Sequence, residues 1–587
     1  MSRAEAGTWA VLLVAGTIAT PSAAVGQDAD PPRHLVGLWA AERTFGPDVS
    51  GAVTLRREGA DFWAEIGGHH VDVRLEGHQI RFEAGGERGY FRGRLSDDGG
   101  SIEGHWVQPW NFRSFSELAT PLTLLAQEAG VWTGNLTPAR DGLRFYLKIQ
   151  RQPDGRLGAF IRNPEANIGR FYPIHDILGQ DDALSFVDSE GRTRLQGIYH
   201  ERRGRLSVYF PLNGGTYDFT RVDGDRASPF SARPVGAEPY RYRRPVEAEG
   251  WQSADPAAVG MSEGPLQELV RRIASTPIDA IDAPYIHGFL VARRGRLVLE
   301  EYFHGYSRHD PHATRSASKS VTSTLVGSSE HAGLLSRDAL VYDAMGATGG
   351  SEDRDPRAAR MTLEHLITNT SGLACDDSDR DSPGNEDVMQ NQEDVPDWHR
   401  YTLDLPLVHD PGTHAAYCSG GLNLAGGVLA RLANSWLPEV FREQLAEPLG
   451  IGVYHMNLTP TGEGYGGGGL FIKPRDFLKL GQLYLNDGVW NGRRLLAPGW
   501  AAEATTPRST IRDEGYGYGW WMFSYPYEGR EVGAFYAGGN GGQYVIVVPE
   551  LELAVAIFGA NYNQRAAAAV SKYEYVRDYV LAAIEDD

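Results

Sequence analysis

The hydrophobic pattern changes once along this chain of 587 residues, and that change limits the fold more than any other feature. Through residues 32–222, short segments such as 206–210 alternate apolar and polar residues between Gly and Asp turns. A period of two with frequent turns predicts antiparallel strands. From residue 251 onward, apolar residues follow helical spacing, as in 422–432, with apolar strands in between. The sequence therefore predicts an all-β domain followed by a mixed domain.

The predicted all-β domain, residues 32–222, contains two internal repeats. The Gly-Leu-Trp of 37–39 is echoed by the Gly-Val-Trp of 130–132, and the strand pattern of 80–106 is echoed in 184–199. Repetition at this scale predicts two copies of one strand-rich unit. We expect the strands to pack as a sandwich or to close into a barrel.

The two predicted domains are separated by residues 223–250, which are rich in Pro and Arg and have little apolar periodicity. This composition predicts an extended linker lying over the next domain. In residues 251–587, helical patterns are interleaved with strands such as 288–292, and 544–558 has the pattern of a hairpin. Helices packed against an antiparallel sheet are expected, so the fold class is α+β.

The N-terminus has the pattern of a secretory signal. Arg3 precedes an apolar run over 9–18, and Pro21 and small residues follow as far as Gly26. We expect a signal peptide over 1–26 and an exported protein, either periplasmic or secreted. The apolar run is too short to span a membrane and no later segment is long enough, so no membrane span is expected.

Charge and cysteine content restrict the partners. The formal net charge of -20 argues against nucleic acid, because binding phosphates requires a basic face. A small-molecule substrate fits better. Cys375 and Cys418 are the only cysteines, and export would allow either a disulfide between them or two buried thiols.

The sequence lacks the usual motifs of a metal site and of an α/β-hydrolase. The sequence has no His-Glu-x-x-His motif, no Cys/His cluster at zinc spacing and no Gly-x-Ser-x-Gly motif. The acidic segment 376–381 lacks the turn glycine and closing Glu of a calcium loop, and we interpret it as a solvated loop near the cleft. No metal and no other cofactor is expected.

One short segment carries the chemistry. Ser316 and Lys319 are three residues apart at a predicted helix start, so both side chains lie on one face. The chain has only five lysines, and Lys319 alone has a serine three residues before it. A serine hydroxyl becomes a nucleophile when a base takes its proton, and burial lowers the pKa of a lysine so that it can be that base. We therefore expect the pKa of Lys319 to lie well below that of free lysine.

Three segments in order resemble the serine β-lactamase and penicillin-binding-protein superfamily, especially its class C β-lactamase, family VIII carboxylesterase and nylon-oligomer amidase branch. Residues 315–320 are similar to the nucleophile motif, 363–373 to a structural helix and turn, and 417–419 to the Tyr-x-Asn motif. The likeness runs from about Gly250 to the end. It implies a β-lactamase/transpeptidase-like fold over 251–587, with helices on both faces of an antiparallel sheet and a helical subdomain. By the same resemblance Ser316 is the nucleophile, Lys319 its base and Tyr417 a second base or proton shuttle.

The family's third motif, Lys-Thr-Gly, is incomplete. Residues 535–543 match its glycines and the following turn but contain no lysine. The motif glycine is Gly538 or, after a slip of one residue, Gly539, and a backbone N–H there would complete an oxyanion hole with that of Ser316. The candidate oxyanion and substrate-binding residues are Ser316, Ser419, Gly538, Gly539 and Asn540.

The missing lysine decides the expected substrate. In the β-lactam and peptidoglycan enzymes that cation helps to bind a carboxylate, so its absence favours neutral acyl groups. We expect a serine hydrolase, a carboxylesterase or amidase, that forms an acyl-enzyme on Ser316. Two alternatives stay open: a β-lactamase or D-alanyl-D-alanine carboxypeptidase, and a catalytically lapsed protein that binds cell-wall glycans. The acyl group, the leaving group and the oligomeric state are also open at this point.

Overall fold

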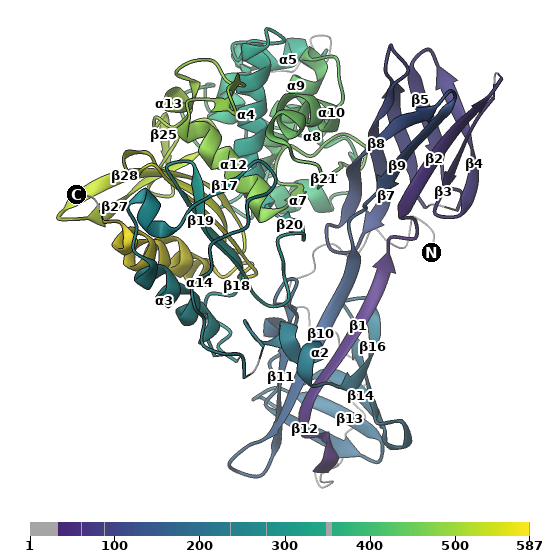
Figure 1. Cartoon of the computed structure of the whole chain (residues 1–587), viewed down its shortest axis with the longest axis vertical. Coiled ribbons are helices and arrows are strands. Elements are labelled where there is room, and N and C mark those ends of the chain that lie inside the picture. Colours follow the sequence, from purple (N-terminus) through teal and green to yellow (C-terminus); the bar gives the residue numbers. More distant parts are fainter. Residues whose placement is uncertain are drawn as a thin grey trace.

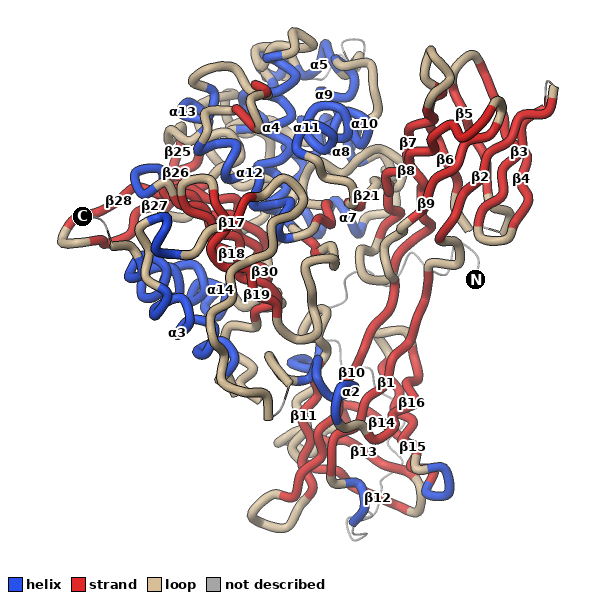
Figure 2. Tube along the Cα trace, viewed as in Figure 1, coloured by secondary structure: helices blue, strands red, loops and turns tan. Residues whose placement is uncertain are grey.

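The computed structural model describes residues 33–585 apart from 60, 87, 235, 278 and 348–354. The predicted signal peptide, 1–26, lies outside this range. Two β-rich parts form an arm beside a mixed part in which helices cover a sheet, as Figures 1 and 2 show. The α+β class and the β-rich N-terminal region are as predicted. No helix among the described residues is long and apolar enough to cross a membrane.

The first β-rich part is a closed, barrel-like antiparallel sheet. Its strands pair in sequence order, and the last strand also pairs with the first, which closes the sheet. Alternate side chains point inward and form a core of their own that includes Phe91, Trp106 and Leu124. The strands are β2 (Gly51–Glu58), β3 (Asp61–Ile66), β4 (His69–Glu76), β5 (Gln79–Glu83), β6 (Tyr90–Leu95), β7 (Ser101–Asn111), β8 (Ser116–Glu128) and β9 (Val131–Leu136).

The second β-rich part takes one strand from before the first. β1 (Gly37–Gly46) pairs with β10 and β16, although β2 to β9 lie between β1 and β10 in sequence. The sheet order is β11-β10-β1-β16-β15-β14-β13-β12, around a core that includes Trp39, Phe145 and Phe210. The remaining strands are β10 (Asp141–Arg151), β11 (Leu157–Arg162), β12 (Asp176–Gln180), β13 (Ala183–Val187), β14 (Thr193–His200), β15 (Arg205–Phe210) and β16 (Gly215–Arg221).

Residues 223–250 begin with the short helix α2 (Gly224–Ala227) and then run along helix α3 (Glu263–Ala274) of the mixed part. The Tyr242 backbone N–H donates to the Gln267 side chain at 3.1 Å, and the Arg271 guanidinium donates to the Tyr240 carbonyl at 3.1 Å. This segment therefore lies over the mixed part, with its backbone tied to α3.

The mixed part is built on a sheet of order β17-β19-β18-β30-β29-β28-β27-β26-β25. One face packs against α3 and the C-terminal helical segments, and the other against α4 and α12, so each face has its own core. The strands are β17 (Gln252–Ser253), β18 (Ile286–Arg293), β19 (Arg296–Tyr302), β25 (Ser509–Ile511), β26 (Glu514–Tyr516), β27 (Trp521–Tyr527), β28 (Arg530–Gly539), β29 (Gln543–Val548) and β30 (Leu553–Gly559).

Helices surround this sheet and form a separate helical layer beside α4. The C-terminal α14 (Arg565–Val570) and a π-helical segment, Ser571–Val580, cover one face of the sheet. The other helices are α4 (Ser318–His331), α5 (Val341–Ala344), α6 (Leu363–Ile367), α7 (Glu386–Asn391), α8 (Trp398–Leu403), α9 (Ser419–Leu432), α10 (Leu437–Phe441), α11 (Glu447–Leu449), α12 (Pro474–Leu485) and α13 (Trp500–Ala504).

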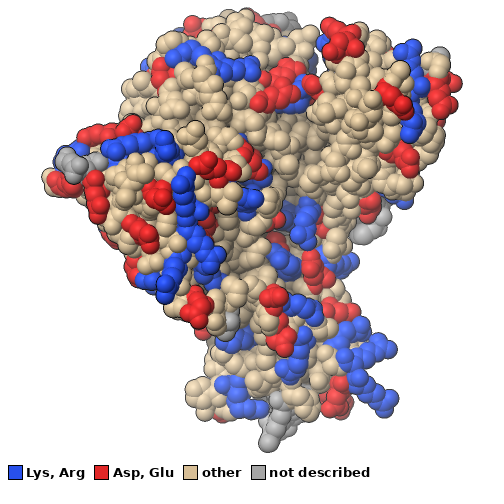
Figure 3. Space-filling model, in the orientation of Figure 1, with Lys and Arg blue, Asp and Glu red and all other residues tan. Residues whose placement is uncertain are grey.

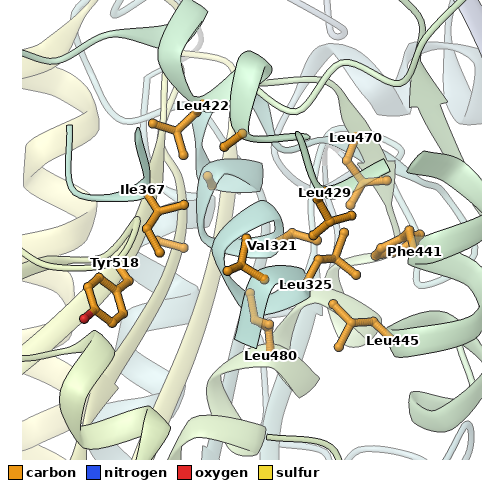
Figure 4. Close-up of a cluster of buried hydrophobic side chains, with 14 of the residues drawn as sticks. Val321, Leu325, Ile367, Leu422, Leu429, Phe441, Leu445, Leu470, Leu480 and Tyr518 are labelled. Atoms are coloured by element: carbon orange, nitrogen blue, oxygen red, sulfur yellow. The ribbon is translucent and has the colours of Figure 1, made fainter. Parts of the chain in front are cut away.

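Helix α4 is the centre of the mixed part. Its residues from Ser318 to Ser329 are all buried. Figure 4 shows Val321 and Leu325 among Leu422 and Leu429 of α9 and other apolar side chains of the surrounding elements. A helix packed on all sides has little freedom to shift, so the residues at its start are held in place. A helix begins beside Ser316, as the sequence predicts.

The first barrel-like sheet continues into the mixed part. β8 pairs with β21 (Tyr454–Asn457), β21 with β22 (Leu470–Ile472), and β22 with β20 (His312–Ala313). At the junction the buried His105 ring contacts Glu439 and the Tyr454 hydroxyl, each at 2.7 Å. Strand pairing and buried polar contacts thus join the two parts.

The molecular surface carries both signs of charge. On the face in Figure 3, acidic and basic side chains are interspersed over both the arm and the mixed part. The net negative charge of the chain is therefore not gathered in one acidic patch on that face.

Candidate active site

Ser316 lies in a tight turn, Arg315–Ala317, between β20 and the start of α4. Thr314 anchors the turn, because its backbone N–H and its hydroxyl both donate to the Leu470 carbonyl at 2.8 Å. Arg315 has a φ of 51°, in the left-handed region that costs energy for a residue with a side chain. This turn leaves Ser316 half-buried at the N-terminal end of α4, where the helix dipole favours negative charge.

Lys319 connects Ser316 to the rest of the site. Its ammonium nitrogen lies 3.0 Å from the Ser316 hydroxyl and 2.8 Å from the Ser419 hydroxyl, and it donates to the Gly467 carbonyl. The residue is only 1% exposed. A protonated lysine has three donors, and all three have acceptors here. The predicted approach of Lys319 to Ser316 is present.

The expected direction of the Lys319 pKa shift is wrong. Burial alone lowers the pKa, as expected, but Tyr417 and the carboxylates of Glu386 and Asp377 oppose it and raise the pKa above its ordinary value. Negative groups near a buried ammonium stabilise the charged form. Lys319 is therefore held as an ammonium in the resting site.

Tyr417 lies beside Lys319, with its ring centroid 4.9 Å from the ammonium nitrogen. The ring also contacts Trp521, at 5.4 Å between centroids, and the exposed Arg512 guanidinium lies 4.7 Å from its centroid. Tyr417 is 7% exposed and so lies between a buried cation and one at the surface. The structure thus brings Ser316, Lys319 and Tyr417 together.

The segment 417–419 is held by the predicted structural turn that follows α6. The Ala416 N–H donates to the Asn369 carbonyl at 3.0 Å, and the Cys418 N–H donates to the Asn369 side chain at 3.1 Å. Cys418 caps α9, and it forms a disulfide with Cys375. Of the two states left open for the cysteines, the structure has the disulfide.

The interpretation of 376–381 as a solvated loop is wrong for Asp377. Its carboxylate accepts the Ser419 hydroxyl at 2.6 Å and the Ser419 N–H at 2.9 Å, and it accepts the Glu386 N–H at 2.9 Å. Among acidic residues, Asp377 and Glu386 were both missed. The cue was the cysteine pair, because a bridge between 375 and 418 would have placed Asp377 beside Ser419.

Of the two glycines proposed for the oxyanion hole, Gly539 faces the nucleophile turn. A side chain there would collide with the Thr314 carbonyl, at 2.1 Å, and crowd the Ala317 nitrogen. A side chain at Gly538 would instead meet Tyr536 and Trp521. Only glycine at position 539 lets β28 approach Ser316 so closely.

Asn540, the remaining substrate-binding candidate, is exposed in the turn after β28. Its side-chain amide donates to the side-chain oxygen of Asn563 at 2.7 Å and accepts the Asn563 backbone N–H at 2.7 Å. These contacts tie Asn540 to the loop after β30 and occupy the polar groups that it would offer to a substrate.

The place of the family's missing lysine is occupied by an aromatic cluster. Tyr536 on β28 stacks near Trp521 and donates its hydroxyl to Glu514. Lys572, from the C-terminal helical segment, lies 3.9 Å from the Tyr536 ring centroid, but its ammonium is paired with Glu514 at 3.0 Å. Lys572 is thus already neutralised by a carboxylate.

Comparisons with known proteins relate the mixed part to one family. A family model described as Beta-lactamase matches residues 287–581. The 6-aminohexanoate-dimer hydrolase of Paenarthrobacter ureafaciens is 24% identical over 256 residues, which are 43% of this chain and 63% of that protein. Penicillin-binding protein 4 of Amycolatopsis lactamdurans is 26% identical over 276 residues, 40% of this chain and 68% of that protein. The match thus spans a little under two thirds of the first of these relatives.

Among solved structures, a penicillin-binding-protein homologue from Caulobacter crescentus is 16% identical, with a TM-score of 0.41, and covers 55% of this chain and 98% of its own. The family match extends over half of the chain and includes Ser316, Lys319 and Tyr417. This chain belongs to the β-lactamase family, within the superfamily of serine β-lactamases and penicillin-binding proteins.

Proposed function

We propose that the protein is a serine hydrolase that forms an acyl-enzyme on Ser316 and hydrolyses small esters or amides with neutral acyl groups. The observation that carries this proposal is the 3.0 Å contact between the Lys319 ammonium and the Ser316 hydroxyl, beside Tyr417. A hydroxyl in contact with a proton-transfer pair is the arrangement that nucleophilic catalysis needs.

The chemistry follows from these positions. The Ser316 oxygen attacks the acyl carbon, and the Lys319 ammonium gives one of its protons through the Tyr417 hydroxyl to the leaving oxygen or nitrogen and takes up the Ser316 proton in its place, as the bond from the leaving atom to the acyl carbon breaks. We assign the backbone N–H groups of Ser316 and Gly539 to the oxyanion, at the positive end of α4. Water then attacks the acyl-enzyme, and its proton returns to Ser316 by the same route.

The substrate class is inferred from the charges around the site. Glu514 neutralises Lys572 near the place of the family's lysine. Asp377 and Glu386 lie on the Lys319 side of the site, where they would repel an anion. These carboxylates favour a neutral acyl group over one with its own carboxylate.

The test is hydrolysis of p-nitrophenyl butyrate and of the matching p-nitroanilide, with Ser316→Ala and, as a matched control, the exposed Ser336→Ala. We expect turnover by wild type and Ser336→Ala, none by Ser316→Ala, and an acyl adduct on Ser316 by intact mass. Equal turnover by wild type and Ser316→Ala would refute the proposal. A fluorophosphonate probe that leaves Ser316 unlabelled would support the catalytically lapsed alternative.

A second candidate, a β-lactamase or D-alanyl-D-alanine carboxypeptidase, is favoured by Arg512. This exposed cation on the β25–β26 turn lies over Tyr417 and donates to the Ser378 hydroxyl at 2.7 and 3.0 Å. A substrate carboxylate could replace Ser378 as its partner. Labelling of Ser316 by a fluorescent penicillin, lost in Arg512→Gln, would establish this candidate; no labelling would exclude it.

Export remains part of the proposal. It is supported by the apolar N-terminal segment 9–18 and by the disulfide between Cys375 and Cys418, since disulfides persist in oxidising compartments. Fractionation of cells that express the full chain, followed by N-terminal sequencing of the product, tests it. Cleavage after Gly26 and recovery outside the cytoplasm are expected, whereas an intact N-terminus in the cytoplasm would count against export.

A further inference from the structure

Three consecutive residues of the site segment each have a partner in residues 375–377. The Asp377 N–H donates to the Tyr417 carbonyl at 2.8 Å, and Cys375 is bonded to Cys418. The Asp377 carboxylate accepts both the N–H and the hydroxyl of Ser419. These four links fix the segment that carries Tyr417 and Ser419 against one short stretch of loop.

The direction of the hydrogen bonds at Ser419 follows from counting protons. A serine hydroxyl has one proton, and an ionised Asp377 can only accept, so Ser419 donates to it at 2.6 Å. Lys319, as an ammonium, can only donate, and its nitrogen lies 2.8 Å from the same Ser419 oxygen. An ionised Asp377 therefore turns the Ser419 oxygen toward Lys319 as an acceptor.

This arrangement matters because Ser419 stands where the family has Asn. An amide presents its oxygen and its nitrogen in a fixed plane, whereas a hydroxyl rotates freely unless a partner fixes it. Ser419 is fully buried, and Asp377 is the partner of both its hydroxyl and its N–H. One carboxylate thus accepts from both donors of Ser419.

We propose that Asp377 is a positioning residue of this active site, which orients the Ser419 hydroxyl and through it holds the Lys319 ammonium against Ser316. The role rests on the proposed acyl-enzyme function. Asp377 does not touch the reacting atoms, and its effect passes through Ser419.

The charges around Asp377 predict how activity should depend on pH if Asp377 has this role. Burial, and then the nearby Glu386, raise the pKa of Asp377 to about 6, while Lys319 and the Ser419 hydrogen bond act in the opposite direction. As the pH falls through about 6, Asp377 takes up a proton and stops acting as an ionic acceptor for Ser419. Activity should therefore fall on the acid side near pH 6.

The groups that face Asp377 come from every element around it. The near groups are Lys319 from α4, Glu386 from α7, and Tyr417 and Ser419 at the start of α9. Tyr465 and Arg512 lie one step further away, through hydrogen bonds to Glu386 and Ser378. Of these groups, Glu386 is the carboxylate that raises the pKa of Asp377.

The first test is the pH dependence of kcat and KM for p-nitrophenyl butyrate in Asp377→Asn. The amide keeps an acceptor of the same shape but no charge. We expect kcat to fall roughly tenfold to a hundredfold with little change in KM, and the acid limb near pH 6 to disappear. Asp376→Asn is the matched control, because the Asp376 carboxylate accepts the Ser378 N–H at 2.8 Å instead. Wild-type kcat and an unchanged acid limb in Asp377→Asn would overturn the role.

The second test does not alter Asp377 itself. Glu386→Gln removes the negative charge that raises the Asp377 pKa, so the acid limb should move to lower pH by roughly half a unit or more. An acid limb that stays in place would also overturn the role, since a purely structural Asp377 would not respond to the charge at 386.

A fluorophosphonate probe separates this inference from the proposed function. If wild type is not labelled at Ser316, the proposed function fails, and the role of Asp377 fails with it. If wild type and Asp377→Asn are labelled at equal rates over pH 5 to 8, only the role of Asp377 fails. Slower labelling of Asp377→Asn, with wild-type labelling of Asp376→Asn, is the expected result.

Discussion

Two buried lysines in the mixed part lie beside tyrosines and carboxylates, and the comparison between them shows what a reactive site requires. The Lys319 cluster consists of Ser316, Lys319, Asp377, Tyr417 and Ser419, and the Lys572 cluster of Glu514, Tyr536, Lys572 and Tyr573. In both, the ammonium lies against a tyrosine ring, at 4.9 and 3.9 Å.

The difference lies in what else the ammonium contacts. Lys572 pairs directly with Glu514 at 3.0 Å, and burial lowers the pKa of Lys572 in spite of that carboxylate. Lys319 reaches its carboxylate only through Ser419, so it keeps a donor for the half-buried Ser316 hydroxyl. A buried lysine beside a tyrosine is thus insufficient. The reactive arrangement needs a hydroxyl at the helix start and a carboxylate that reaches the lysine through an intervening serine.

The largest effect is expected for Lys319→Met, which removes the ammonium from the Lys319 cluster. Without a group to receive and return the Ser316 proton, kcat/KM for p-nitrophenyl butyrate should fall roughly ten-thousandfold. Lys572→Met is the matched control. If both variants lose activity equally, the two clusters do not differ as described.

Tyr417→Phe should have the next largest effect, because it removes one hydroxyl of the proton route and keeps the ring that packs against Trp521. We expect kcat/KM to fall roughly a hundredfold to a thousandfold, with an unchanged melting temperature. Tyr573→Phe makes the same change in the Lys572 cluster and should leave kcat/KM at the wild-type value. Full activity in Tyr417→Phe would remove Tyr417 from the proton route.

Breaking the disulfide should have an intermediate effect. In the double variant Cys375→Ser and Cys418→Ser, hydrogen bonds alone hold the segment 417–419 to Asp377, and small displacements of reacting groups slow catalysis. We expect kcat to fall roughly tenfold, and the free energy of unfolding in urea to fall by about 4 kcal/mol, since the bridge closes a loop of 43 residues. Unchanged kcat with lowered stability would limit the disulfide to a structural role.

The smallest effect on activity is expected for Lys572→Met. It leaves the half-buried Glu514 carboxylate without its cation, so the free energy of unfolding should fall by about 3 kcal/mol. Because Lys572 makes no contact with Ser316, kcat should change less than about threefold. Denaturant unfolding and steady-state kinetics on the same preparation check both. A large loss of kcat at unchanged stability would contradict the comparison.

The fold was predictable where the pattern is local. Period-two alternation identified the β-rich region, and helical spacing identified α9. The pairing of β1 with β10 and β16 was not predictable, because strand alternation says which face of a strand is buried and not which strand is its neighbour. The junction between β8 and β21 was missed for the same reason.

For the candidate active site too, local spacing was predictable and long-range contacts were not. The three-residue spacing of Ser316 and Lys319 fixed their proximity, and the order of motifs added Tyr417. Asp377 was missed because a run of acidic residues has the composition of a solvated loop, and long-range contacts that include the disulfide bring it to Ser419. The pKa direction of Lys319 was wrong for that reason, since the carboxylates that raise it come from this part of the chain.

The continuous sheet from β8 through β21 and β22 to β20 has a practical consequence for anyone who wishes to shorten this protein. A chain cut to begin at residue 251 would leave β21 as an unpaired edge, with Tyr454, His455 and Glu439 stripped of their partners on β7 and β8. Open edges recruit other strands and promote aggregation. Because β20 leads directly to the Ser316 turn, the β-rich arm and the reactive serine should be expressed, engineered and inherited as one unit.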